Sequence, residues 1–196
     1  KKTIFLTPNV SYKNEIEKAI SNSKIKLVER YIYSSKPTML TNQIEKITKY
    51  KKRKQNLADE ITRLEESSEN NKEQLIEELK KKDTLGSVGF DSIIIADFDE
   101  GLKSVTTSLL YTDISPKKKY FITLNQWFDE SLLKETSSQP LYFPSINIKN
   151  YEAFSLEYFK KFNHYPNQIA FLSFDLVGLV YYLILQNDLV IDNKMF

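Results

Sequence analysis

The sequence contains no cysteine, one histidine and only four glycines. Without cysteine the chain has no structural disulfide, no thiolate zinc site and no thiol nucleophile. Four glycines leave no nucleophile elbow, Walker loop or dinucleotide-binding fingerprint. The histidine, His164, falls in an expected interhelical loop, and we interpret it as a surface or half-packed side chain rather than as part of a catalytic triad.

Long apolar runs and an excess of one charge are also missing. No run reaches the ~18 residues of a membrane-spanning helix, and the longest patch, 176–185, is expected to be a core helix. The 28 Lys+Arg and 26 Asp+Glu leave a net charge of +2, which does not argue for nucleic acid as a partner. Of the basic residues only Arg30, Arg53 and Arg63 are arginine. In this lysine-rich background we interpret the run 49–54 as a solvated helix face.

The 196 residues are 41% hydrophobic and 13% aromatic, which suffices for the core of one domain. Apolar runs predict strands at 3–7, 25–33, 90–97, 120–124 and 141–143. Amphipathic spacing predicts helices at 11–21, with Ser11 as N-cap, and at 99–111, 151–162 and 168–185. This alternation predicts an α/β fold, a Rossmann-like three-layer lobe with a mostly parallel sheet and helices on both faces.

A charged segment interrupts the pattern between the second and third strands. Residues 41–83 hold 11 Lys/Arg and 10 Asp/Glu, with no glycine or proline. Apolar side chains near a 3.5-residue spacing predict a helical hairpin over 38–84, with one long helix, a polar turn at 67–71 and a shorter helix. Its narrow apolar stripe suits one partner, either another protein or the lobe itself.

The carboxyl ends of parallel strands are where such sheets bind ligands. Aromatic rings there, such as Tyr12 and Trp127, can wall a ligand, dock a partner or simply cover the sheet edge. We assign no catalytic residue, no metal ligand and no cofactor. The candidate ligand- or partner-binding residues are Asn9, Ser11, Tyr12, Asp97, Asp99, Gln126, Trp127 and Ser145.

Asp97 and Asp99 flank Phe98 at one of these strand ends. Two carboxylates two residues apart can serve as an acid/base pair or hold a divalent cation. The structural alternative is that Asp97 ends the strand and Asp99 caps the following helix. We favour the structural alternative.

Several segments together resemble the second lobe of a type I periplasmic binding protein. Residues 3–12 (TIFLTPNVSY) resemble its opening strand, loop and tyrosine, although Lys13 replaces the usual glycine. Residues 28–31 and 90–97 resemble two further strands. Residues 158–166 (YFKKFNHYP) resemble the family's Y-x-x-x-F-G-x-x-P turn, with Asn163 in place of glycine, and 172–177 resemble its "YDAV" helix start.

The charged hairpin, together with residues 125–129 (NQWFD), resembles the penicillin-binding protein activator branch of alphaproteobacteria within the Leu/Ile/Val-binding-protein-like family. The resemblance implies a two-lobed periplasmic protein, often lipid-anchored, of which this chain (1–196) is a single lobe. Both ends of the sequence look cut from a longer protein. An isolated lobe exposes its inter-lobe face and is expected to self-associate.

Three functions remain open at this stage. The first is a non-enzymatic periplasmic lobe that regulates peptidoglycan synthesis by binding a peptidoglycan synthase or another periplasmic protein. The second is the solute-binding component of an ABC importer, which binds an amino acid or a small polar ligand. The third is a cytosolic α/β enzyme, which rests only on Asp97 and Asp99. We expect no nucleic-acid partner. No arginine lies near the candidate strand ends, which favours the first function over amino-acid capture.

Overall fold

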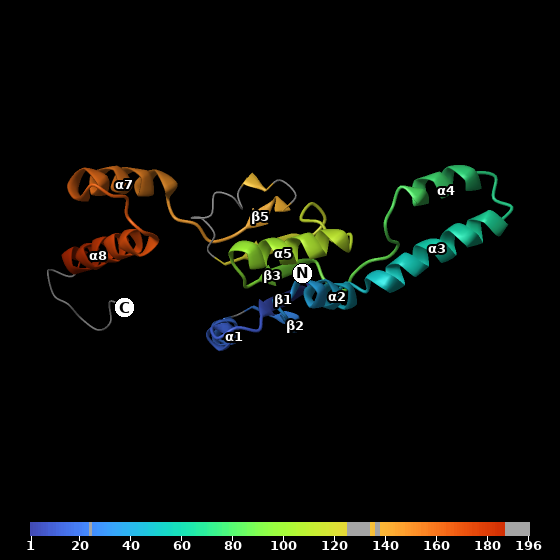
Figure 1. Cartoon of the computed structure of the whole chain (residues 1–196), viewed down its shortest axis with the longest axis horizontal. Helices are drawn as coiled ribbons and strands as arrows, with labels where there is room; N and C mark the ends of the chain where they lie inside the picture. Colours follow the sequence, from blue (N-terminus) through green and yellow to red (C-terminus); the bar gives the residue numbers. More distant parts are fainter. Residues whose placement is uncertain (24, 125–133, 136–137, 187–196) are drawn as a thin grey trace. The chain divides into compact units, whose positions relative to one another are not determined.

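The computed structural model describes residues 1–23, 25–124, 134–135 and 138–186. The chain forms two compact units, Lys1–Pro144 and Ser145–Phe196. The first unit carries the sheet and the charged insertion, and the second carries two helices (Figure 1).

The first unit is built on a five-stranded sheet in which every pair of neighbours is parallel. Leu6 pairs with Tyr31 on one side and with Ile95 on the other, so β1 lies centrally between β2 and β3. The predicted α/β, Rossmann-like class is confirmed. The strands, in the spatial order β2-β1-β3-β4-β5, are β1 (Thr3–Pro8), β2 (Leu27–Tyr33), β3 (Ser92–Ile95), β4 (Tyr120–Thr123) and β5 (Leu141–Tyr142).

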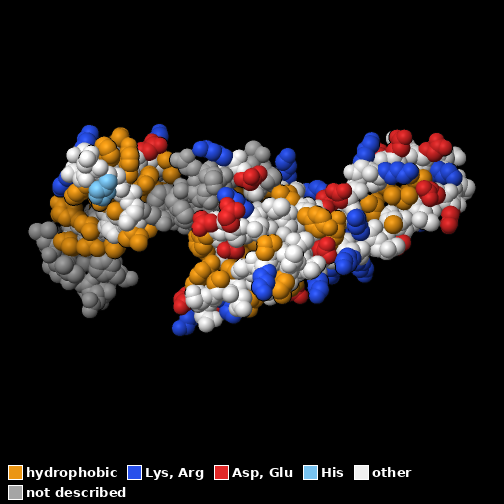
Figure 2. Space-filling view, viewed as in Figure 1, with side chains coloured by type: hydrophobic (Ala, Val, Ile, Leu, Met, Phe, Trp, Pro, Cys, Tyr) orange, Lys and Arg blue, Asp and Glu red, His pale blue; other side chains and the backbone are white. Residues whose placement is uncertain are grey.

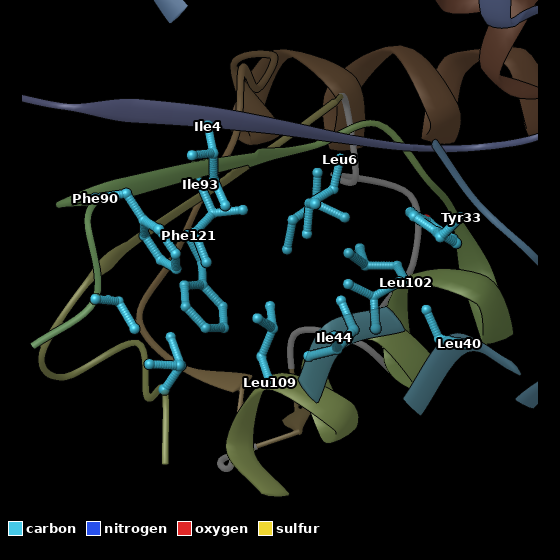
Figure 3. Close-up of a cluster of buried hydrophobic side chains, with 14 of the residues drawn as sticks. Ile4, Leu6, Tyr33, Leu40, Ile44, Phe90, Ile93, Leu102, Leu109 and Phe121 are labelled. Atoms are coloured by element: carbon cyan, nitrogen blue, oxygen red, sulfur yellow. The ribbon is translucent and has the colours of Figure 1, made fainter. Parts of the chain in front are cut away.

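Helices α2 (Pro37–Ile47) and α5 (Asp99–Tyr111) supply the side chains that cover one face of the sheet (Figure 3). Alternate residues of the central strands, such as Ile93 and Ile95, are fully buried there because successive strand side chains point to opposite faces. Leu102 and Leu109 of α5 are also fully buried. Burying each such side chain contributes roughly 1.5–3 kcal/mol, so this layer holds the lobe together.

Helix α1 (Lys13–Asn22) begins two residues later than predicted. Tyr12 occupies its N-cap position and no side chain caps it, so the predicted Ser11 cap is wrong. Ser11 lies in the turn that precedes the helix and is exposed. The consequence is that the Ser11 hydroxyl remains at the surface after β1.

The predicted long helix of the insertion is two helices, α2 and α3 (Tyr50–Glu66). Lys49 between them has φ 52°, a left-handed conformation that an α-helix cannot contain. The apolar stripe is divided accordingly. Leu40 and Ile44 join the main core, whereas Leu57, Leu64 and Leu79 form a separate small core between α3 and α4 (Lys72–Lys80). We call α3, α4 and the turn between them the arm. Its stripe is buried within the arm itself.

Arg53 fixes the base of the arm to the lobe. It lies in the run that we predicted to be a solvated face, yet it is only 6% exposed. Its guanidinium donates to the Thr112 carbonyl at 3.0 Å and to the Thr84 hydroxyl at 2.5 Å, and forms an ion pair with Asp113 at 3.4 Å. Burial lowers the pKa of Arg53, and the Asp113 charge opposes that shift. The arginine is therefore a structural anchor.

The second unit consists of α7 (Ile148–Phe162) and α8 (Gln168–Gln186). The Asn147 side chain caps α7 by accepting from the Asn150 amide at 3.3 Å, and Asn163 ends it with φ 56°. Phe171 is buried between them, where its ring contacts those of Tyr151 and Phe154. Helix α7 therefore covers only a small part of the largely apolar surface of α8.

Helix α8 is mostly exposed, so the prediction of a core helix at 176–185 is wrong. Only 6% of the residues in the apolar segment Ile169–Gln186 are buried. Val177 and Tyr181 are 69% and 64% exposed, and hydrophobic side chains cover much of this unit's visible surface (Figure 2). The segment is long and apolar enough to cross a membrane, a criterion that core helices of soluble proteins also meet. Asp175 near its middle makes a crossing costly, by about 2.5–3.5 kcal/mol.

Candidate binding edge of the sheet

The strand order places a topological switch point between β1 and β3. The chain leaves β1 toward β2 on one side and returns to β3 on the other, so the connections diverge at the carboxyl ends of these two strands. Ligands of open α/β sheets bind in the crevice that such a divergence leaves. The segments after β1 and β3 are therefore the candidate binding edge.

The structure brings five of the eight predicted residues to this edge. Asn9, Ser11 and Tyr12 follow β1, and Asp97 and Asp99 follow β3. Gln126 and Trp127 lie outside the described residues. Ser145 is exposed and belongs to the second unit, so it is not part of this edge of the first unit.

A buried tyrosine–carboxylate pair closes the centre of the edge. The Tyr33 hydroxyl, at the end of β2, donates to Asp97 Oδ2 at 2.6 Å, and the Phe98 amide donates to Asp97 Oδ1 at 2.9 Å. Tyr33 is 2% exposed and Asp97 is 8% exposed. Burial raises the pKa of Tyr33, and the hydrogen bond and charge of Asp97 raise it further. The hydroxyl therefore stays protonated as a donor to the carboxylate.

Gly101 in the first turns of α5 makes room for this carboxylate. A Cβ atom at position 101 would lie 2.5 Å from Asp97 Oδ2, which is closer than real contacts allow. The helix can approach the strand end only because this residue has no side chain. The pair is thus enclosed by β2, β3 and α5.

Tyr12 covers the outer side of the pair. Its ring packs edge-on against Phe98, with ring centroids 6.4 Å apart, and is half-buried. Burial raises the pKa of Tyr12, with a smaller contribution from the Asp97 charge. The Asn9 amide donates to the Tyr33 carbonyl at 3.0 Å, which ties the loop after β1 to β2. The side chains of Asn9 and Ser11 are exposed beside the Tyr12 ring.

The two aspartates do not share one environment. Asp97 is buried and occupied by two donors, whereas Asp99 is exposed, in the first turn of α5 with φ 47°. Phe98 is the N-cap of α5 and no side chain caps it, so the predicted Asp99 cap is wrong. Among the described residues no group of three or more His, Cys, Asp or Glu could hold a metal ion. Among the predicted residues, the edge therefore exposes the Asn9 amide, the Ser11 hydroxyl and the Asp99 carboxylate beside the half-buried Tyr12 ring.

A shallow groove of about 580 Å³ continues from the edge along the end of β2. Asn9 and Tyr33 lie at one side of it, and Lys36, Met39 and Gln43 of the α2 start lie at the other. Gln43 Oε1 accepts from the Ser34 amide at 2.9 Å, which fixes that wall. The groove combines a cation, an amide and a thioether, a set that accepts a small polar group or a peptide segment.

Sequence reasoning missed Tyr33 as a member of this site. It was assigned to a strand, and its partner Asp97 lies 64 residues further along the chain, so no local pattern joins them. His164 is exposed, and its ring contacts Tyr158 at 5.3 Å, as expected for a surface histidine.

Comparison with known proteins adds no assignment to this geometry. A scan of family models, a search of curated proteins and a search of solved structures each find no match to this chain.

Proposed function

We propose that this chain is a non-enzymatic binding lobe that acts in the periplasm by docking a peptidoglycan synthase through the binding edge of its sheet. The compartment and the partner class rest on the sequence resemblance to penicillin-binding protein activators. The fold agrees with that resemblance, since type I periplasmic binding proteins have lobes of this parallel α/β class. The full-length protein is proposed to be lipid-anchored.

The observation that carries the proposal is the closure of Asp97 by Tyr33. A general acid or base must reach the proton that it transfers, within about 3 Å or through one water. Both carboxylate oxygens of Asp97 instead accept hydrogen bonds within the protein, one from the Tyr33 hydroxyl and one from the Phe98 amide. What the edge offers to a partner is Asn9, Ser11 and the Tyr12 ring, which suit recognition better than proton transfer.

The groove beside Asn9 favours a second candidate function, solute binding for an ABC importer. Lys36 can pair with the carboxylate of an amino acid, and Gln43 can accept from an ammonium group. The groove is open and shallow, so one lobe contacts only one side of such a ligand. A second lobe would have to supply the rest.

A bulky substitution on the exposed edge tests the docking function. Ser11→Trp places an indole beside Tyr12, where a partner must approach, without touching the buried pair. We expect the full chain to bind a purified peptidoglycan synthase in surface plasmon resonance, and Ser11→Trp to weaken that binding at least about tenfold. Ser87→Trp is the matched control, because Ser87 is equally exposed but precedes β3, at the opposite edge of the sheet.

Two results would overturn the proposal. One is equal synthase binding by Ser11→Trp and Ser87→Trp, which would remove the edge from the interface. The other is the absence of any synthase binding together with calorimetric heat from an amino-acid mixture, which would favour the importer function. In that case Lys36→Ala should abolish the heat.

A further inference from the structure

The charges of the insertion follow a basic–acidic–basic order along the sequence. Residues 46–54 and 80–82 contain lysines and Arg53 but no acidic residue, whereas residues 59–78 contain eight Asp/Glu and two Arg/Lys, a net charge of −6. Because α3 and α4 fold back on each other, the two basic segments meet at one end of the arm. The acidic segment occupies the other end. We call residues 46–54 and 80–82, which include the end of α2 and the residues after α4, the base, and residues 59–78 the tip. The base is basic and the tip is acidic.

Exposure confirms that these charges form the surface of the arm. The base carries eight exposed lysines, against Glu45 and Asp83. Figure 2 shows blue side chains along the part nearest α2, and red side chains with some blue ones over the outer end. The arm's apolar residues, including Leu57, Leu64 and Leu79, face inward. The eight lysines are Lys46, Lys49, Lys51, Lys52, Lys54, Lys80, Lys81 and Lys82.

The arm cannot neutralise its own two ends. Helix α3 has 17 residues and is about 25 Å long at 1.5 Å per residue. Arg53 and the Leu85 amide, which donates to the Arg53 carbonyl at 3.0 Å, hold the base in place. With the Debye length near 8 Å at physiological salt, tip and base of one arm do not attract each other appreciably. Both ends therefore keep a net charge that a surface of opposite charge on another molecule can contact.

The base also has a hollow lined by lysines. It has a volume of about 490 Å³ and lies where α2 meets α3, at the left-handed Lys49. Its one carboxylate, on Glu45, is 3.8 Å from Lys51 Nζ. The hollow is lined by Asn42, Glu45, Lys46, Lys49, Lys51 and Lys52.

We propose that two copies of this chain pair through their arms, antiparallel, with the acidic tip of each on the basic base of the other. A two-fold axis between the arms makes the two contacts identical and closes the pair, so no filament forms. The contact is independent of the binding edge of the sheet. The observation behind it is that one arm carries both complementary surfaces, at separated positions.

The pair is held by exposed charges, which sets its strength. Exposed ion pairs contribute roughly 0.2–1 kcal/mol each and are screened by salt. We therefore expect association at about 20 mM salt and dissociation at roughly 0.5 M, the opposite of an apolar contact, which salt strengthens.

The absence of cysteine makes a position-specific test direct. Glu66→Cys labels the tip, Lys52→Cys labels the base, and Lys18→Cys on α1 is an exposed control position. Variants of this 196-residue chain are mixed in pairs with a short bis-maleimide cross-linker at low salt. We expect tip–base cross-links at least about fivefold above tip–tip, base–base and tip–control products. Equal yields from all pairs would overturn the proposal. Association through α8 would give that result, because it does not bring tip and base together.

Charge reversal gives a second, independent readout. Glu65→Lys/Glu66→Lys/Glu77→Lys brings the net charge of the tip from −6 to 0, and Lys52→Glu/Lys54→Glu/Lys82→Glu leaves the base with five exposed lysines against five carboxylates. Lysine and glutamate have similar helix propensities, so circular dichroism should not change. In sedimentation velocity each variant alone is expected to be monomeric. Their mixture is expected to pair, because the natural acidic tip of the base variant can still contact the natural basic base of the tip variant. Undiminished dimers of either single variant, or no pairing in the mixture, would contradict the antiparallel arrangement.

Discussion

At the scale of single residues, the molecule depends on polar pairs that local sequence does not disclose. Tyr33 and Asp97 are far apart in the chain. Tyr33 ends β2 and Asp97 follows β3, and their side chains meet across the carboxyl end of β1, which lies between these two strands. The sequence did allow Asn9, Tyr12 and Asp97 to be placed at strand ends, because strand ends follow from where apolar runs stop. It did not reveal that Asp97 is enclosed, since enclosure depends on Tyr33 and on the bare Cα of Gly101.

Removing the Tyr33 hydroxyl tests this pair. Tyr33→Phe leaves the buried Asp97 carboxylate without one donor and should lower the free energy of unfolding by about 1–3 kcal/mol at pH 7. Urea denaturation measures the change. Tyr165→Phe is the control, because that side chain is 66% exposed, and it should change little.

The same variant predicts a pH dependence. The pKa of Tyr33 is raised in the folded state, so above about pH 10 the unfolded chain releases this proton while the folded chain retains it. The contribution of the raised pKa is therefore complete below pH 10 and declines as pH increases. The stability difference between the natural chain and Tyr33→Phe should narrow between about pH 10 and 11.5. A difference that grows with pH in the same urea series would contradict this sign.

At the scale of elements, the insertion shows how far periodicity extends. The hairpin was predictable because its apolar residues keep helical spacing around a polar turn. The break at Lys49 was not, because Tyr50 bridges the apolar gap between Ile47 and Leu57 and no glycine or proline marks a break. Burial of Arg53 was hidden in a lysine run. One signal was available: arginine stands among lysines in a chain with three arginines, and its fork of donors suits several buried acceptors at once.

The two arginines of α3 predict contrasting costs. Arg53→Met leaves the Thr112 carbonyl without its buried donor and removes the guanidinium from the Thr84 hydroxyl and Asp113. Asp113 still accepts from the Thr84 hydroxyl at 2.7 Å and lies 3.2 Å from Lys118. We expect a loss of about 2–4 kcal/mol in urea denaturation. Arg63→Met, on the same helix as Arg53, removes exposed ion pairs to Glu60 and Glu69 and should lower the free energy of unfolding by less than about 1 kcal/mol. Equal losses would show that Arg53 is not the anchor of the arm.

At the scale of the whole molecule, alternation along the chain predicted the class of fold, but not the partition of the chain. The order of strands in the sheet was left undetermined because periodicity gives neighbours in sequence, not in space. The exposure of α8 was missed for a related reason. An apolar helix is predicted to be buried on composition alone, and what buries it depends on the elements around it.

The apolar surface of α8 should promote aggregation at high salt, since a net charge of +2 provides little repulsion between molecules. Val177→Glu/Tyr181→Lys replaces two exposed apolar side chains with an i, i+4 ion pair and should keep the helix intact. We expect weaker fluorescence of a bound hydrophobic dye and less aggregation in sulfate. Ala58→Glu/Thr62→Lys, with the same spacing on the arm, should change neither measurement.

The hydrogen bond between the Arg53 carbonyl and the Leu85 amide has a consequence for how this chain tolerates change. The outgoing and returning backbones of the insertion meet there, so the passage from β2 through α2 to β3 is already complete beneath them. A segment whose ends touch can be shortened, lengthened or exchanged for an unrelated one at little topological cost. The arm can therefore be replaced by another segment without altering the path of the chain through the sheet.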